Sequence, residues 1–263
     1  MRVYIVDAFT DGPDSGNPAA VSILEEEIPD RAKQKIASEV NLSETAFLLE
    51  KDGVFELRWF TPETEVDLCG HATLASAHII FTLGIIPATE DAVFSTKSGV
   101  LTARRKNDLV EMDFPSEDPW EVGMPKDLLI AISSAPLYVG RNRFDYIALY
   151  ENEETIRNAV PELNHVKKLD SRGLIITSIS SSDRYDFVSR FFAPNAGIDE
   201  DPVTGSAHCC LCPFWSRRLG KKELAGYQAS ERGGLVHTRL LEKRVCLSGK
   251  ATVTGNFEID PAS

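Results

Sequence analysis

Three titratable side chains stand where acid–base chemistry could take place: Glu44, His71 and Asp201. Glu44 lies between the polar residues 41–43 and an apolar segment, where a carboxylate can be held partly out of water. Partial burial would raise its pKa towards the range that suits a general base. His71 follows Gly70 at the expected start of a helix, whose dipole disfavours the imidazolium ion. We therefore expect a neutral imidazole that can donate to a substrate oxygen and accept a proton.

Each of these three residues also has a structural interpretation. A lone glutamate at the end of a strand is most often exposed, and a histidine beside an apolar run is most often part of the hydrogen-bonded structure. Asp201 stands just before a second expected helix, where an acidic side chain can cap the N-terminal N–H groups. The catalytic interpretation depends on the three side chains acting together.

Small residues begin both expected helices. Gly70 and Ala72 flank His71, and Gly205 and Ser206 open the second segment. A ligand can therefore approach the backbone closely at either place. Helix N-termini carry unpaired N–H groups and a partial positive charge, which favour an anion such as a small carboxylic acid. The alternative is that the glycines only begin buried helices, and the sequence leaves both interpretations open.

The chain contains a long internal repeat. Residues 58–67 recur as residues 190–199, at an offset of 132 positions, and each copy is followed by an apolar stretch that closes on Leu-Gly. A long period that is present only twice indicates two similar halves rather than a solenoid of short repeats. We expect the two halves to face each other across a cleft that holds the active site.

The two apolar stretches predict the architecture. Residues 73–81 and 207–215 have no polar face, which is typical of helices that are buried on all sides. We therefore expect an α+β fold of two pseudo-symmetric halves, each a barrel-like, mostly antiparallel sheet around a central apolar helix. Residues 115–126 contain three prolines and a glycine and are the best linker candidate. The N-terminal half is placed at residues 1–117, with the last C-terminal strand as a candidate addition, and the C-terminal half at residues 118–263.

Local patterns predict the remaining elements. A cluster of turn formers makes residues 11–18 a loop, and Pro213 should kink the second central helix unless the helix ends there. Strands are expected at residues 2–9, 45–50, 54–60, 91–96, 99–105, 109–114, 136–141, 144–150, 173–179 and 185–192, and in a final run from 226 to 259. Helices are expected at residues 29–40, 125–132, 151–160 and 205–219.

Composition and charge limit the classes of partner. The chain has 43% hydrophobic and 26% charged residues and a net charge of -12. This charge repels polyanions and no basic stripe opposes it, so no nucleic-acid partner is expected. The N-terminal apolar run is too short for a signal peptide, and the longest apolar stretch, residues 72–87, is too short to span a membrane. Five cysteines without a disulfide framework favour a reducing compartment. We expect a cytoplasmic protein with no membrane partner.

The cysteines raise two further hypotheses. Cys69 precedes the first central helix, whose N-terminus lowers a thiol pKa, so Cys69 is a candidate acid–base thiol. A two-base epimerase needs a matched group on the other half, but the repeat places Asp201 there. The run from His208 to Cys212 has the wrong spacing for a tetrahedral metal site, so core cysteines and no metal are expected. The glycine patterns match neither a dinucleotide fingerprint nor a P-loop, so no nucleotide cofactor is expected.

Segments in order along nearly the whole chain carry a family resemblance: residues 6–9, 16–21, 41–47, 58–62, 67–75, 192–194, 200–208 and 228–234. In these segments the sequence resembles the PhzF-like phenazine-biosynthesis family, which shares its fold with diaminopimelate epimerase. The resemblance implies two pseudo-symmetric halves with the site between them, a homodimer, and catalysis without a cofactor.

The resemblance also implies residue roles. In the phenazine enzyme, which isomerises a dihydro-hydroxyanthranilic acid, the acid–base residue is the glutamate of the motif that is matched here by Glu44. The supporting His, Asp and Ser of that enzyme match His71, Asp201 and Ser206. With the small residues at the helix starts and a residue of the matched segment 16–21, the substrate-binding candidates are Asn17, Gly70, Ala72, Gly205 and Ser206.

The expected function is therefore a cofactor-independent isomerase with a small anionic carboxylic acid as substrate. Glu44 would remove a proton from carbon and return it elsewhere on the same molecule, a step that needs a closed site from which water is excluded. One alternative is an amino-acid racemase or epimerase that uses Cys69 against Glu44 or Asp201. Another is a binding protein that kept the fold, lost its chemistry, and binds small acids without exchanging their carbon-bound protons.

Overall fold

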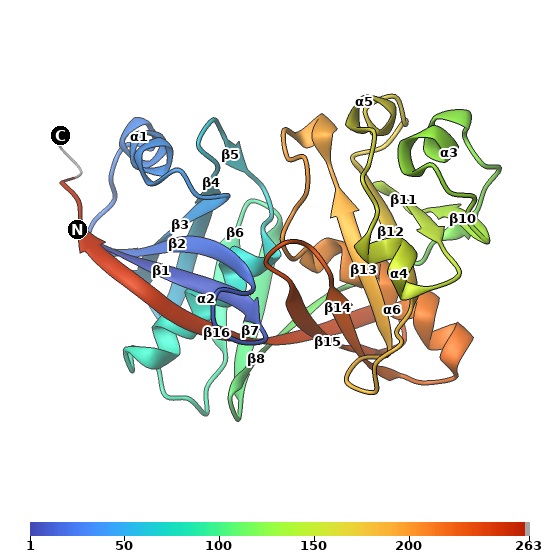
Figure 1. Cartoon of the computed structure of the whole chain (residues 1–263). Coiled ribbons are helices and arrows are strands. Elements are labelled where there is room, and N and C mark those ends of the chain that lie inside the picture. The colour runs from blue at the N-terminus through green and yellow to red at the C-terminus, as the bar shows by residue number, and fades with distance from the viewer. Residues whose placement is uncertain (261–263) are drawn as a thin grey trace. The chain divides into compact units, whose positions relative to one another are not determined.

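A computed structural model describes residues 1–260 (Figure 1). The chain divides into two compact units. The first unit contains Met1–Asp113 and the chain from Ser248 onward, and the second contains Phe114–Leu247. The last strand of the chain therefore begins in the second unit and continues into the first.

The first unit is a closed barrel. Its strands pair in the order β1-β2-β3-β4-β6-β7-β8-β16, and β16 also pairs with β1, which closes the ring. The strands are β1 (Arg2–Thr10), β2 (Asn17–Leu24), β3 (Glu44–Lys51), β4 (Val54–Phe60), β6 (Ala92–Thr96), β7 (Gly99–Lys106), β8 (Leu109–Pro115) and β16 (Arg244–Glu258), and the short β5 (Glu65–Val66) pairs with β4. The β2–β3 and β4–β6 pairs are parallel, whereas β1–β2, β3–β4, β6–β7, β7–β8 and β1–β16 are antiparallel. The prediction of a mostly antiparallel sheet is confirmed.

One helix runs through this barrel. α2 (Gly70–Thr82) packs against β1, β2, β3 and β7, and its side chains are buried along almost its whole length (Figure 1). An apolar sequence on every face explains this position, because no side of the helix could face water without exposing apolar area. A second helix, α1 (Asp30–Val40), packs on β3 and β4. Its Ile36 and Ala37 join a core cluster with Phe47 and Phe60.

The second unit contains the other long helix, α6 (Gly205–Leu219), and its own sheet. Its strands are β9 (Trp120–Glu121), β10 (Tyr138–Arg141), β11 (Asp145–Leu149), β12 (Gly173–Ile179), β13 (Phe187–Phe192), β14 (Glu223–Gln228) and β15 (Gly234–Leu240). Shorter helices are α3 (Lys126–Ile132), α4 (Glu153–Arg157), α5 (Leu163–Val166) and the 3-10 turn η1 (Pro194–Ala196). Phe187, Phe191 and Ile175 of the sheet form one core cluster with Leu211 and Phe214 of α6.

The strand pairings support the internal duplication. In the first unit the succession from β1 to β7 is antiparallel, parallel, antiparallel, parallel, antiparallel. The succession from β10 to β15 in the second unit is the same. The long helix follows the fourth strand of this succession in each unit, α2 after β4 and α6 after β13. The repeat seen in the sequence therefore corresponds to one structural unit that is used twice.

Pro213 lies inside α6, which continues through it to Leu219. Proline has no backbone N–H, so the carbonyl of Cys209, four residues earlier, loses its partner within the helix. The backbone N–H of Glu117 donates to this carbonyl at 3.1 Å. A loop residue thus supplies the bond that Pro213 cannot make, which is why the helix tolerates the proline.

Several boundaries differ from the sequence-based prediction. The strand β2 was not predicted at all, and it begins at Asn17 within the predicted loop 11–18. A two-residue strand, Trp120–Glu121, lies in the predicted linker and pairs with β10. α4 is shorter than the predicted helix 151–160; its start is set by Asn152, whose side chain accepts from the N–H of Thr155. Tertiary pairing and capping decided these limits, and local composition does not encode them.

Candidate active site

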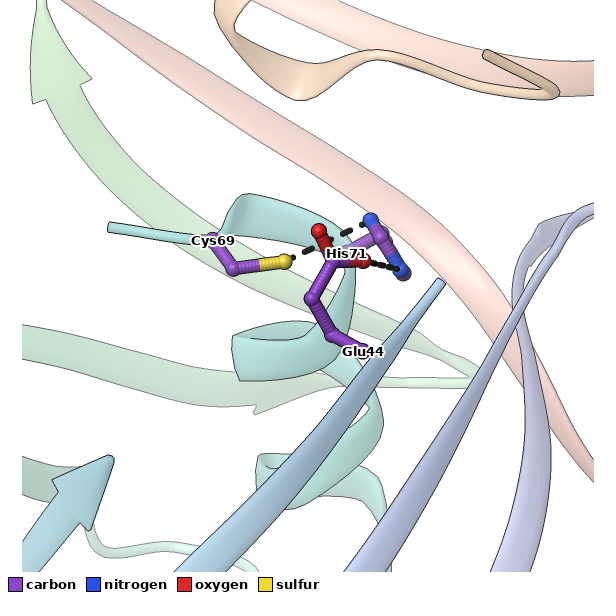
Figure 2. Close-up of side chains that lie close together, drawn as sticks. All are labelled: Glu44, Cys69 and His71. Carbon is purple, nitrogen blue, oxygen red and sulfur yellow. Dashed lines mark hydrogen bonds and ion pairs between the residues drawn. The ribbon is translucent and has the colours of Figure 1, made fainter. Parts of the chain in front are cut away.

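The candidate residues of the first unit lie where two strands and a helix begin. β2 begins at Asn17, β3 begins at Glu44, and α2 begins at Gly70, directly after its N-cap Cys69. Because β2 and β3 are parallel neighbours, both begin at the same end of the barrel. Figure 2 shows the side chains of Glu44, Cys69 and His71 turned toward one another beside the first turn of α2. The sequence-based pairing of Glu44 with His71 therefore corresponds to a real cluster.

His71 is the centre of this cluster. Its Nε2 lies 3.1 Å from Oε2 of Glu44, and its Nδ1 lies 3.3 Å from Nδ2 of Asn17 and 3.5 Å from Sγ of Cys69. The Asn17 amide is a donor at Nδ1, so the neutral ring carries its proton on Nε2, which faces Glu44. In the cationic ring Nδ1 also donates, and the sulfur of Cys69 is the acceptor.

The facing atoms of Glu44 and His71 are incompletely hydrogen-bonded. Both side chains are buried, and neither Oε2 of Glu44 nor Nε2 of His71 makes a well-directed hydrogen bond within the described chain. Their short separation is thus an ion-pair contact with poor hydrogen-bond angles. Buried polar atoms without directed partners are rare in folded proteins and are most often explained by a ligand or a catalytic role.

The pKa of His71 is raised well above its ordinary value. Burial alone lowers it, but the sulfur of Cys69, which accepts from the cationic ring, and the charge of the Glu44 carboxylate favour the cation and outweigh burial. The expectation that the helix dipole keeps this imidazole neutral is wrong. An anionic side chain at 3.1 Å acts on the ring more strongly than the partial charge of a helix end does.

This raised pKa predicts a pH-dependent contribution to stability. Because the folded-state pKa lies above the unfolded value, the stabilisation is fully present below the unfolded pKa and is lost as pH rises through the folded one. His71→Gln should therefore lower the free energy of unfolding more at pH 6 than at pH 9, because the cation that Glu44 stabilises is present at the lower pH. Urea unfolding across this range measures the difference.

His78 on the same helix is the matched control. Its pKa is lowered by burial and by the nearby charge of Arg105. A histidine whose pKa is lowered in the folded state destabilises the fold as pH falls. The free energy of unfolding of His78→Gln, relative to that of the wild type, should therefore be higher at pH 6 than at pH 9. Equal slopes for the two variants would contradict the assignment of His71.

Cys69 is a buried thiol rather than an activated thiolate. The residue is 7% exposed, and burial raises the pKa of its thiol, with the Glu44 carboxylate adding to the rise. The expected lowering of this pKa by the N-terminus of α2 is therefore wrong, because removal from water and a nearby negative charge outweigh the dipole.

In the second unit, Asp201 is tied into a side-chain network. Its Oδ2 accepts from Oγ1 of Thr204 at 2.6 Å, and its carbonyl accepts from Nε2 of Gln228 at 2.7 Å. Oε1 of Gln228 in turn accepts from the N–H of Thr204 at 2.9 Å. The N-cap of α6 is Thr204, whose own side chain makes no capping hydrogen bond. The carboxylate of Asp201 thus binds the hydroxyl of the residue that begins the helix.

The small residues occupy the two helix starts as expected. Gly70 and Ala72 lie in the first turn of α2, where Ala72 is fully buried, and Gly205 and Ser206 are the first two residues of α6. Ser206 accepts a hydrogen bond at 2.9 Å from Arg172, a residue that the sequence analysis did not select. Arg172 immediately precedes β12, and its conspicuous feature in the sequence is only that a charge stands next to a strongly apolar strand.

Two cysteine-containing groups bear on metal binding. Ligand atoms of Glu44, Cys69 and His71 lie within 4.8 Å of one another, so this cluster has the donor types and size of a metal site. Cys209, Cys210 and Cys212 lie buried in α6, and burial raises the pKa of all three. Protonated thiols in a core pack as small apolar side chains and are poor metal ligands.

None of the helices in residues 1–260 is long and apolar enough to cross a membrane.

Comparisons with known proteins agree with this fold. The family model described as phenazine biosynthesis-like protein matches residues 6–256. A protein of Halalkalibacterium halodurans named as an uncharacterized isomerase is 50% identical over 258 residues, or 98% of this chain and 97% of that protein. The crystal structure of a PhzF-family phenazine biosynthesis protein from Enterococcus faecalis has a TM-score of 0.93 at 40% identity and covers 97% of each chain. A probable proline racemase from Agrobacterium radiobacter has a TM-score of 0.66 at 9% identity, over 98% of this chain and 92% of that one, and is similar in fold alone.

The predicted fold class is confirmed, because the neighbours share the α+β architecture of diaminopimelate epimerase. Relatives that cover nearly the whole chain at 50% and 45% identity are named isomerases. The chain belongs to the PhzC-PhzF family of phenazine biosynthesis-like proteins and is an isomerase.

Proposed function

We propose that this isomerase moves a proton within a small carboxylic acid, without a cofactor, and that Glu44 is the acid–base residue. One observation carries the proposal. Oε2 of Glu44 and Nε2 of His71 are buried 3.1 Å apart, and neither makes a well-directed hydrogen bond. A carboxylate oxygen without a well-directed hydrogen bond is open to a substrate, so a substrate C–H can reach it without displacing a tight partner.

The proposed step conserves atoms and electrons. The Glu44 carboxylate takes a proton from a carbon made acidic by conjugation or by a neighbouring carboxylate, and the electron pair of that C–H bond stays on the substrate. The carboxyl group of Glu44 then returns the proton to a different carbon of the same molecule. The His71 cation, whose raised pKa keeps it protonated, stabilises the ionised form of Glu44 between turnovers. Nothing is oxidised or reduced.

The carboxylate class of the substrate, the homodimer, and the participation of Asp201, Gly205 and Ser206 belong to the same proposal and rest on the family resemblance. The alternative of a two-base epimerase needs an ionisable thiol at Cys69. Burial and the Glu44 charge raise the pKa of that thiol, which favours the single-base reaction.

Solvent-deuterium incorporation tests the proposal. Hydroxy-, amino- and cyclic unsaturated acids are incubated with the protein in D2O and analysed by mass spectrometry for exchange or isomer formation. We expect incorporation into at least one acid, unchanged after dialysis against a chelator, and within about tenfold of the wild-type rate for Cys69→Ala. Loss of turnover in Cys69→Ala would favour the epimerase mechanism. Saturable binding of an acid without any exchange would favour the binding-protein alternative.

A further inference from the structure

An ion pair between the partly exposed Arg172 and the buried Asp145 lies next to Ser206 in the second unit. Asp145, the first residue of β11, is 1% exposed, and both its carboxylate oxygens accept from Arg172, at 2.9 Å for Nε to Oδ1 and 2.5 Å for Nη2 to Oδ2. The N–H of Arg172 donates to the carbonyl of Phe144 at 2.7 Å, and its guanidinium lies over the rings of Phe144 and Phe191. Two hydrogen bonds to one carboxylate, with aromatic rings beside the guanidinium, orient this group strongly.

This fixed guanidinium determines the hydrogen bonding of Ser206. Nη2 of Arg172 donates to Oγ of Ser206 at 2.9 Å. Arginine has donors only, so Ser206 must be the acceptor and its own O–H hydrogen must point elsewhere. Within the described chain, that hydroxyl makes no other hydrogen bond.

The usual internal acceptor for such a hydroxyl is not used by Ser206 and has another donor. A serine in a helix commonly donates to the carbonyl four residues earlier, which here is that of Pro202. The hydroxyl of Ser230 donates to this carbonyl at 2.8 Å. Ser206 is half-buried at the start of α6, so its O–H is left as a directed donor at a partly enclosed surface.

We propose that Arg172, locked by Asp145, is a positioning residue that presents the Ser206 hydroxyl to an oxygen of the substrate, such as a carboxylate oxygen. The inference rests on the proposed function, because it takes the substrate to be a small acid. Asp145 neutralises the charge of Arg172, so the group recognises the substrate by a directed hydrogen bond and not by net positive charge. Arg172 acts only through Ser206: it does not contact the substrate and takes no part in the proton transfer by Glu44.

The test is a double-mutant cycle on binding. Ligand-observed NMR measures the dissociation constants of L-lactate, L-alanine and cyclohex-1-ene-1-carboxylate for the wild type, Arg172→Lys, Ser206→Ala and the double variant. A hydrogen bond to a charged acceptor corresponds to a loss of about tenfold or more in affinity. We expect each single variant to lose that much for at least one acid, and the double variant to lose no more than Ser206→Ala alone, because one residue acts through the other.

Two controls separate the possible failures. Arg141→Lys, in the same unit, removes an arginine that bonds the Asp170 carbonyl and should leave the affinities unchanged. Glu44→Gln should bind the same acids but not exchange them, so loss of exchange with intact binding concerns only the proposed function. Additive losses in the double variant, unchanged binding in Arg172→Lys, or no binding of any of the three acids by the wild type would overturn the inference. Asp145→Asn, which keeps the shape but not the charge, should reproduce Arg172→Lys.

Discussion

Replacement of Glu44 by glutamine should lower the rate of proton exchange into the substrate by about 10²- to 10⁴-fold, the usual contribution of a general acid–base residue. The amide has nearly the shape of the carboxylate but cannot take up or release a proton at neutral pH. In the unchanged protein Nε2 of His71 lies 3.1 Å from Oε2 of Glu44. The amide oxygen of the glutamine can take the place of that carboxylate oxygen. The fold should therefore persist while the chemistry stops. Mass spectrometry of deuterium incorporation measures the rate, and thermal unfolding reports the fold.

Glu50→Gln is the matched control. Glu50 lies on the same strand as Glu44 but is exposed, and it accepts from the N–H of Gly53 in a turn. Glutamine can keep that bond, so exchange should equal the wild-type rate. Exchange that survives in Glu44→Gln at more than about a tenth of the wild-type rate would assign the proton transfer to another group.

The sequence was sufficient to select the main members of the first-unit cluster. Glu44 and His71 each precede an apolar segment, and because β3 and α2 begin at the same end of the barrel, the two side chains meet. The central position of α2 and α6 also followed from the sequence, since a helix without a polar face has to be buried. These predictions succeeded because they rest on periodicity and on element ends, which are local properties.

Charge states and partner choice could not be predicted from the sequence. The protonation of His71 depends on a carboxylate far away in the chain, and the role of Asp201 depends on which hydroxyl its oxygen meets. Arg172 could not be selected either, because its bonds to Asp145 and Ser206 join three separate segments. The whole of β2 was missed, because the turn formers before it and its proline at the second position obscure an otherwise apolar strand.

The internal repeat had a further consequence that only the structure reveals. The two arginines that begin the repeat, Arg58 and Arg190, each hold a glutamate with two parallel hydrogen bonds. Arg58 binds both oxygens of Glu65 at 2.7 and 2.9 Å, and Arg190 binds both oxygens of Glu200 at 2.7 and 2.8 Å. Each glutamate lies in the segment between the repeat's strand and the long helix. The duplicated arginine therefore fixes the approach to a helix start in both units.

The two arginines differ in the partners of their Nη1 atoms. Nη1 of Arg58 donates to Asp30, whose side chain is 66% exposed. Nη1 of Arg190 instead donates to backbone carbonyls in the last turn of α4 and just after it, at 3.2 Å for Ile156 and 2.6 Å for Ala159. An exposed carboxylate can be resolvated when the arginine is lost, whereas a carbonyl that remains buried cannot.

Arg190→Ala should therefore lower the free energy of unfolding by about 2 to 4 kcal/mol, between the values for an exposed pair and a fully buried one. Arg58→Ala should cost about 1 to 2 kcal/mol. Both variants lose the two hydrogen bonds to a glutamate, but only Arg190→Ala leaves partly buried carbonyls without their donor. Urea unfolding of the two variants, with Glu200→Ala and the double variant to isolate the fork, measures the difference. Equal losses for Arg58→Ala and Arg190→Ala would mean that the fork alone carries the stabilisation. A larger loss for Arg190→Ala would mean that this arginine also anchors the chain after α4, which holds the segment leading to Asp201 in place.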